Sequence, residues 1–233
     1  MRSGTSPARV AIAAAVARKD LQVERGSRVV TNQVAPFALV VMVMFAFALD
    51  NEGILQRVAP GLVWLATLFS MLVVVQRSFA VESADGALDA LRVAGVDPAA
   101  IFLGKSVALM VQLFALEAVL VAAAFVLYGV EPTPAGWLEA FVTMLAATIG
   151  LGFVGTLYGG LAAGARGRET LLPLLLLPVV APVLIGATRA TEAAFGSGGA
   201  TVAEGWPWIG LLAVFAVVFG TAGSVAFGPL VDE

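Results

Sequence analysis

The 233-residue sequence contains neither cysteine nor histidine. Without cysteine, the chain has no disulfides, no thiol catalysis and no cysteine-ligated zinc or iron-sulfur site. Without histidine, Ser-His and Cys-His catalysis, ordinary zinc chemistry and histidine-ligated haem are excluded as well. The chemistries that depend on either residue are therefore excluded.

Charge is also scarce. Only 12% of the residues are charged and 60% are hydrophobic, whereas soluble domains average about 25% charged and 45–50% apolar residues. The net charge of −3 argues against nucleic acid as a partner, because that binding relies on clustered Lys and Arg. This composition predicts an integral membrane protein.

Apolar windows of a length that spans a bilayer recur along the chain, and the alternating segments of a barrel do not. Closed barrels and helices are the structures that satisfy every backbone polar group in lipid, so we expect an all-α polytopic protein with six transmembrane helices. The windows are residues 29–49, 58–75, 106–130, 141–163, 171–188 and 206–227. We therefore divide the chain into an N-terminal segment, 1–28, and a six-helix transmembrane domain, 29–233.

The N-terminal segment combines basic residues with apolar ones. Its apolar run, 10–17, is short and mostly alanine, and Arg18, Lys19 and Asp20 follow it where a signal peptide would have a small-residue cleavage site. An amphipathic helix lying at the membrane surface fits this pattern better than a signal peptide does.

The distribution of Lys and Arg predicts the orientation. If the N-terminus is cytoplasmic, eleven of the thirteen basic residues lie inside, and only Arg57 and Arg189 lie outside. The inside residues are Arg2, Arg9, Arg18, Lys19, Arg25, Arg28, Arg77, Arg92, Lys105, Arg166 and Arg168. We therefore expect both termini on the cytoplasmic side of the cell membrane.

The longest inside connection, 76–105, contains a short amphipathic pattern. Ser83 is a suitable N-cap, and Gly95 and Pro98 are typical of a helix end. We therefore expect a short cytoplasmic helix here. It contains Asp85, Gly86, Leu88, Asp89 and Leu91.

This chain has no nucleotide site that we can defend. Gly104, Lys105 and Ser106 resemble the end of a phosphate-binding loop, but Ala99 occupies the position where that loop needs glycine. The segment also opens a hydrophobic span, where Lys105 fits an interfacial anchor. ATP, if the system uses it, should bind a partner.

Glu117 is the one acidic residue well inside a span. A carboxylate there costs a few kcal/mol and usually faces the bundle interior or a water-filled path. One interpretation is a functional group; the other is a protonated glutamate that hydrogen-bonds to a neighbouring helix and has no role in transport.

All four tryptophans, Trp64, Trp137, Trp206 and Trp208, fall at or near the outer ends of spans in this topology. An interfacial aromatic belt explains them. The alternative is an outer surface for a flat aromatic ligand or a partner. Small residues at four-residue spacing, such as Gly155 and Gly159, predict closely packed helices.

Several segments together resemble one family. These are Arg57-Val-Ala-Pro60-Gly61-Leu-Val-Trp64, Arg77-Ser-Phe79, Asp85-Gly86-Ala-Leu88-Asp89-Ala-Leu91, Gly104-Lys105, Leu151-Gly152-Phe153 and Leu172-Pro173 with Pro178 and Pro182. From the second span onward the chain resembles the cytochrome c maturation protein B family, CcmB. It departs from the family pattern at Gln76 and Asp89, where glutamate is common.

The resemblance implies the non-catalytic membrane half of an ABC transporter that acts in haem delivery to c-type cytochromes. The implied partners are a separate ATPase, CcmA, and a haem-handling membrane protein, CcmC. The short cytoplasmic helix would then couple this chain to the ATPase, and the candidate coupling residues are Asp85, Gly86, Leu88, Asp89 and Leu91. Such permeases generally work in pairs, so a homodimer or a dimer with a related permease is implied too. A permease for an unrelated lipid, drug or glycan and a non-transporting scaffold are the alternatives, and a secondary transporter is a weaker one.

We do not expect this subunit to bind a cofactor directly. Methionine and tyrosine are the only common haem ligands present, and a thioether alone is a weak anchor. Haem is then a transported ligand or is ligated by a partner. Any contact with this chain should be stacking near the outer tryptophans.

Overall fold

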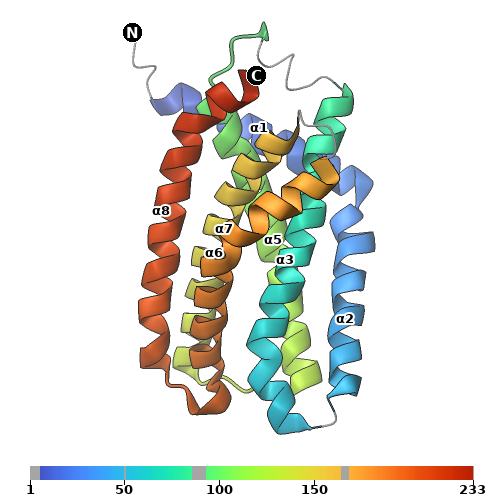
Figure 1. Ribbon diagram of the computed structural model, residues 1–233, viewed down its shortest axis with the longest axis vertical. Helices are drawn as coiled ribbons and strands as arrows, with labels where there is room; N and C mark the ends of the chain where they lie inside the picture. The colour runs from blue at the N-terminus through green and yellow to red at the C-terminus, as the bar shows by residue number, and fades with distance from the viewer. Residues whose placement is uncertain (1–5, 50, 86–92, 164–167, 233) are drawn as a thin grey trace.

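The computed structural model describes residues 6–49, 51–85, 93–163 and 168–232. Six helices in these ranges are long and apolar enough to cross a membrane, which confirms the predicted all-α multi-pass fold. The spanning segments are Val30–Ala48, Gly53–Ala80, Pro98–Tyr128, Pro134–Ala163, Thr170–Phe195 and Val202–Pro229. Figure 1 shows them as one elongated bundle.

Five of the six spans extend beyond their predicted windows at one end or both, and the first lies within its window. The helices are α1 (Ser6–Ser27), α2 (Ala35–Ala48), α3 (Glu52–Asp85), α5 (Pro98–Tyr128), α6 (Pro134–Ala163), α7 (Arg168–Phe195) and α8 (Val202–Asp232), with a π-helical turn at Val30–Val34 and a 3₁₀ turn at Ser197–Gly199. The predicted inside loop, 76–105, is therefore shorter than expected, because α3 and α5 occupy both of its ends.

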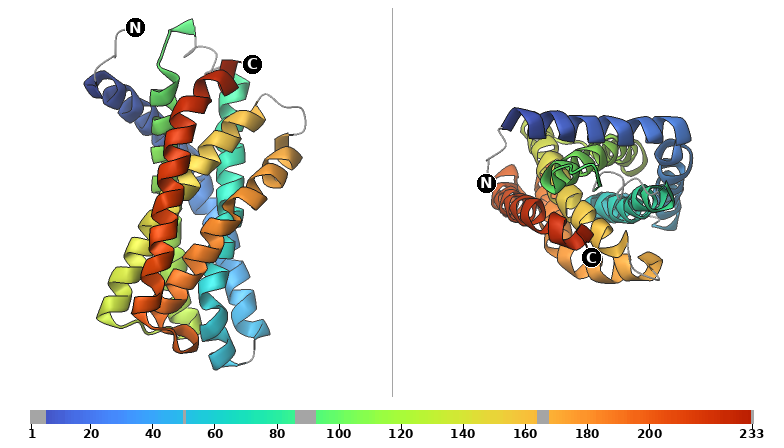
Figure 2. Two further views of the ribbon diagram at one scale, coloured as in Figure 1. Left: turned by 60° about the vertical axis from the view of Figure 1, so that its left-hand side comes forward. Right: turned by 90° about the horizontal axis from the view of Figure 1, so that it is seen from above.

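α1 lies across one end of the bundle (Figure 2). It packs on α5, where Val16 and Ala17 are buried. Gly104 on α5 permits this contact, because a Cβ at that position would lie 2.6 Å from the Ala13 carbonyl oxygen and 2.7 Å from Val16 Cβ. Gly104 is thus a packing residue for the surface helix.

The chain turns sharply from α1 into the first span. Arg28 adopts a left-handed backbone conformation with φ of 50°, which is uncommon for a residue other than glycine. The Val30 amide donates to Glu24 Oε1 at 2.6 Å, and this bond links the end of α1 to the π-helical turn. The surface helix is therefore joined to the bundle through a defined corner.

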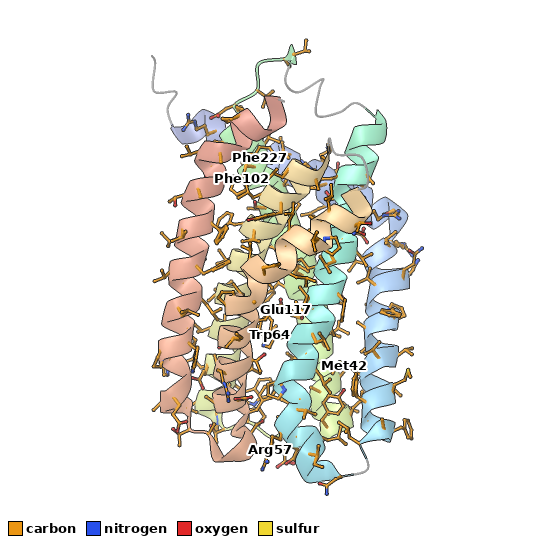
Figure 3. All side chains as sticks on the ribbon, viewed as in Figure 1. Met42, Arg57, Trp64, Phe102, Glu117 and Phe227 are labelled. Carbon is orange, nitrogen blue, oxygen red and sulfur yellow. The ribbon has the colours of Figure 1, made fainter. Side chains whose placement is uncertain are left out.

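Glycines set how closely the spans approach, as the four-residue spacing predicted. A Cβ at Gly159 would lie 2.5 Å from the Phe79 ring, and one at Gly160 would lie 2.7 Å from the Phe227 ring. Phe102 and Phe227 are fully buried with ring centroids 5.6 Å apart, and they fill the bundle near α1 (Figure 3). α6, which carries both glycines, is in contact with α3, α5, α7 and α8.

Two further features follow from the sequence. α7 contains Pro173, Pro178 and Pro182, and Figure 1 shows that this helix bends. Each proline removes a backbone hydrogen bond and bends a helix where it lies.

The N- and C-terminal ends of the chain lie at the same end of the bundle (Figure 1), as an even number of spans requires.

Candidate functional site

The predicted coupling segment follows directly from α3. Asp85 is the last residue of that helix, whereas Gly86, Leu88, Asp89 and Leu91 lie outside the described residues. Ser83 lies within α3, so the prediction that it caps a separate helix is wrong. The segment therefore begins from a long, continuous span.

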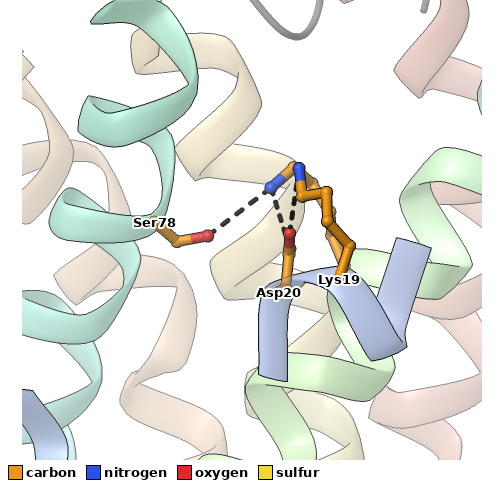
Figure 4. Close-up of polar contacts among 4 residues, drawn as sticks. Lys19, Asp20 and Ser78 are labelled. Carbon is orange, nitrogen blue, oxygen red and sulfur yellow. Dashed lines mark hydrogen bonds and ion pairs between the residues drawn. The ribbon is translucent and has the colours of Figure 1, made fainter. Parts of the chain in front are cut away.

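A buried lysine lies beside that end of α3. Lys105 Nζ is 3.1 Å from Asp20 Oδ2 on α1 and 3.5 Å from Ser78 Oγ on α3, and it lies 4.7 Å from the centroid of the Phe79 ring. Figure 4 shows the contacts with Asp20 and Ser78, together with Lys19, whose Nζ is 3.2 Å from the other Asp20 oxygen. One cation thus joins three helices.

The position of Lys105 differs from the sequence prediction. Its side chain is only 2% exposed, so the expectation of an interfacial anchor is wrong. A buried ammonium is tolerated when it is paired and hydrogen-bonded, and α1 supplies the partner by lying over α5. The sequence did not reveal this pair because Asp20 and Lys105 are 85 positions apart.

Glu117 lies between α5 and α6 at mid-bundle (Figure 3). It is fully buried, and Thr148 Oγ1 donates to its Oε2 at 2.6 Å. Its Oε1 has no hydrogen-bond partner within the described part of the chain. The side chain therefore points into the bundle and connects two helices through one hydrogen bond.

A second buried acid, Glu139 on α6, is not among the site residues that the sequence predicted. It is fully buried, and neither of its oxygens has a partner among the described residues. The apolar window predicted for this span begins at residue 141, which leaves Glu139 in the preceding loop. A signal was available, since the buried residues Gly136, Glu139, Ala140, Thr143 and Ala147 follow helical spacing.

Trp64 differs from the other tryptophans. Its side chain is only 1% exposed, and Nε1 donates to Thr191 Oγ1 at 2.9 Å, joining α3 to α7 inside the bundle. Trp64 therefore does not contribute to the outer aromatic surface that the sequence predicted. The physical reason is that an indole with a polar partner can be buried well away from the interface.

The remaining tryptophans lie near the end opposite α1. Trp137 is 50% exposed and Trp206 is 46% exposed, and Trp208 is partly buried. The Trp137 ring packs against Phe125 with centroids 4.5 Å apart. This end of the bundle therefore presents accessible aromatic rings.

The candidate axial haem ligands are mostly engaged in packing. Tyr128 is buried, and its hydroxyl donates to the Met42 carbonyl oxygen at 2.9 Å. Met42 is 1% exposed and Met71 is completely buried. Across the ranges that the structure describes, no group of three acidic residues is placed to hold a metal ion.

Comparisons with known proteins agree on one family. The family described as CcmB protein matches residues 11–231. Heme exporter protein B of Rhodobacter capsulatus is 36% identical over 151 residues, which is 64% of this chain and 68% of the relative. The Paracoccus denitrificans protein of the same name is 34% identical over 67% of this chain and 71% of its own length. The Escherichia coli one is 33% identical over 68% and 71%.

Proposed function

Because the chain belongs to the CcmB family, we propose that it is the membrane permease subunit of an ATP-driven complex that exports or delivers haem for cytochrome c maturation. The observation that carries this proposal is the family match over residues 11–231, which includes all six spanning helices and the coupling segment. The name shared by the relatives, heme exporter protein B, supplies the substrate.

ATP binds a separate subunit in this proposal. Gly104 and Lys105, which resemble part of a phosphate-binding loop, are both used within the bundle: Gly104 contacts α1 and Lys105 pairs with Asp20. A backbone buried inside a helix cannot cradle phosphates as a loop does. The ATPase is therefore a CcmA-like partner, and this chain is its non-catalytic membrane subunit.

The coupling segment, with Asp85, Gly86, Leu88, Asp89 and Leu91, docks that ATPase on the cytoplasmic side. Short amphipathic helices commonly bind in a groove of a partner. The Lys105 contacts tie α1 and α5 to α3 at Ser78, two turns before α3 ends at Asp85. A movement of the ATPase would thus be passed to three helices together.

The assembly has further members. One chain provides six spans, so a homodimer or a dimer with a related permease completes the transport unit. The α1 end faces the cytoplasm and the opposite end faces outward across the inner membrane, in line with the positive-inside rule. A CcmC-like membrane protein supplies the haem ligands, because the tyrosine and methionine groups described above are occupied by packing.

Copurification from host membranes tests this proposal. The chain is tagged, solubilised in mild detergent and isolated, and its partners are identified by mass spectrometry. We expect a soluble-type ATPase and a haem-handling membrane protein, with ATP hydrolysis that a Walker-lysine substitution in the partner abolishes. Isolation without any ATPase would contradict the proposal and favour the scaffold or secondary-transporter alternatives.

A further inference from the structure

A polar cavity of about 420 Å³ lies at the end of the bundle opposite α1. Three helix ends meet there: the start of α3, the end of α5 and the end of α7. Residues from these ends line it, among them Gln56, Arg57, Gly129, Glu131, Ser197 and Gly198. Its volume falls in the range of small-ligand sites, about 300–1,000 Å³.

Specific hydrogen bonds hold the cavity walls together. Gln56 Nε2 donates to the Gly129 carbonyl oxygen at 2.9 Å, and Ser197 Oγ donates to the Gln56 carbonyl oxygen at 3.0 Å. Gly129 and Gly198 have φ of 62° and 67°, a conformation that side-chain-bearing residues rarely adopt. The cavity is thus a defined junction of α3, α5 and α7.

Arg57 is the cation of this cavity. Among the described side chains no carboxylate forms an ion pair with it, whereas Arg189, the other basic residue assigned to this side, pairs with Glu192 at 2.8 Å. The Arg57 side chain lies against Gly198, since a Cβ there would be 3.9 Å from Arg57 Nε. Figure 3 places Arg57 at this end of the bundle. A guanidinium that no described carboxylate pairs with is suited to bind the carboxylate of a ligand through two parallel hydrogen bonds.

A row of packed aromatic side chains adjoins the cavity wall. Phe195 lines the cavity, its ring centroid is 5.7 Å from that of Phe125, and Phe125 packs against the half-exposed Trp137. A ligand that combines a carboxylate with a flat apolar ring could therefore contact both features. Haem has this chemistry, because its two propionates extend from one edge of the porphyrin.

We propose that the Arg57 cavity binds a propionate carboxylate of haem, with the porphyrin edge directed toward Phe125 and Trp137. This inference rests on the proposed haem function. It assigns the outward end of this subunit a direct contact with the substrate, and it needs no axial ligand from this chain. Glu131 also lines the cavity, so its charge opposes the bound carboxylate.

The test compares haem with haem dimethyl ester, in which both propionates are neutral. The full chain is placed in nanodiscs of zwitterionic lipid, and binding is followed by quenching of tryptophan fluorescence. We expect the wild-type chain to bind haem about tenfold more tightly than the ester, since a charge-assisted bond is lost. Arg57→Gln should abolish that preference, and Arg57→Lys should keep part of it.

Glu131→Gln is the matched control, because it removes the opposite charge from the same cavity. We expect this variant to bind haem as tightly as the wild type or more tightly. Weakening by both Arg57→Gln and Glu131→Gln would indicate structural damage and overturn the proposal. A wild-type chain that does not distinguish haem from its ester would overturn it as well.

Anionic lipid is the competing source of an anion. If phosphatidylglycerol binds the wild type more tightly than Arg57→Gln, while haem and its ester bind the two chains equally, the cavity is a lipid phosphate site and the proposal fails. Deletion of the gene in the host separates the cavity inference from the proposed function. If the deletion stops cytochrome c maturation while Arg57→Gln binds haem normally, the cavity inference is wrong and the proposed function stands.

Discussion

Lys105 and Asp20 form an ion pair between the span α5 and the surface helix α1, with Nζ 3.1 Å from Oδ2. The Lys105 side chain is almost completely buried, and that of Asp20 is 10% exposed. Removing one partner of a buried pair leaves the other charge uncompensated, which costs several kcal/mol. The pair therefore fixes α1 to the bundle, which the apolar contacts of an alanine-rich helix would do only weakly.

We predict that Asp20→Asn lowers the free energy of unfolding by about 3 kcal/mol and makes α1 sensitive to protease. Thermal unfolding and limited proteolysis in detergent measure the two effects. Lys19→Gln is the control, because Lys19 is 44% exposed and contacts the same carboxylate; we expect a loss below about 1 kcal/mol. Equal losses in both variants would show that the buried pair has no special role.

The second prediction concerns Glu117 and Thr148. Glu117→Gln keeps an oxygen that accepts from the threonine hydroxyl, so we expect stability within about 1 kcal/mol of the wild type. Glu117→Ala should cost about 2–4 kcal/mol, because it leaves a cavity and an unpartnered hydroxyl. Denaturant unfolding of both variants measures this difference.

Thr148→Val supplies the control for that pair. Combined with Glu117→Ala in a double-mutant cycle, it should show a coupling energy of about 1 kcal/mol. Loss of cytochrome c assembly in a stable Glu117→Gln variant would instead favour a role for the acid itself. Normal assembly in both Glu117→Gln and Glu117→Ala would leave Glu117 as a structural residue only.

Composition and span length were enough to predict the fold. The chain has few charges and six apolar windows long enough to span a bilayer. Because backbone polar groups must be satisfied within lipid, each window is expected to form one helix that crosses the membrane. Contacts between distant segments could not be predicted in this way. Asp20 and Lys105 meet only because Gly104 admits α1, and Trp64 is buried because Thr191 on another helix accepts a hydrogen bond from its indole N–H. The Arg57 cavity needs three helix ends and was likewise invisible in the sequence.

The third prediction tests the coupling segment. Replacing Leu88 and Leu91 with Asp should release the ATPase from the purified complex, because the apolar face of the predicted helix is lost. Val93→Asp is the control, because Val93 is 91% exposed and, two positions after Leu91, would lie on the opposite face of the helix that the sequence predicts. Quantitative copurification, with the level of each variant in the membrane, measures the result. Unchanged recovery with the double variant would remove this segment as the docking site.

Orientation gives the fourth prediction, and the chain is well suited to it because it contains no cysteine. Single cysteines can replace the exposed residues Val10 on α1 and Glu131 at the opposite end. A membrane-impermeant maleimide added to spheroplasts should label Glu131→Cys and should reach Val10→Cys only after the membrane is opened. The reverse pattern would invert the assigned topology.

The central claim is that this chain works in haem delivery for cytochrome c maturation, and covalent haem in the c-type cytochromes of its host measures that most directly. The gene is deleted and restored on a plasmid, and haem-dependent peroxidase staining is carried out on denaturing gels, with b-type haem as the control. We expect the deletion to abolish covalent haem while apocytochrome and b-type haem remain, and the plasmid to restore it. Unchanged c-type cytochromes in the deletion strain would contradict the account.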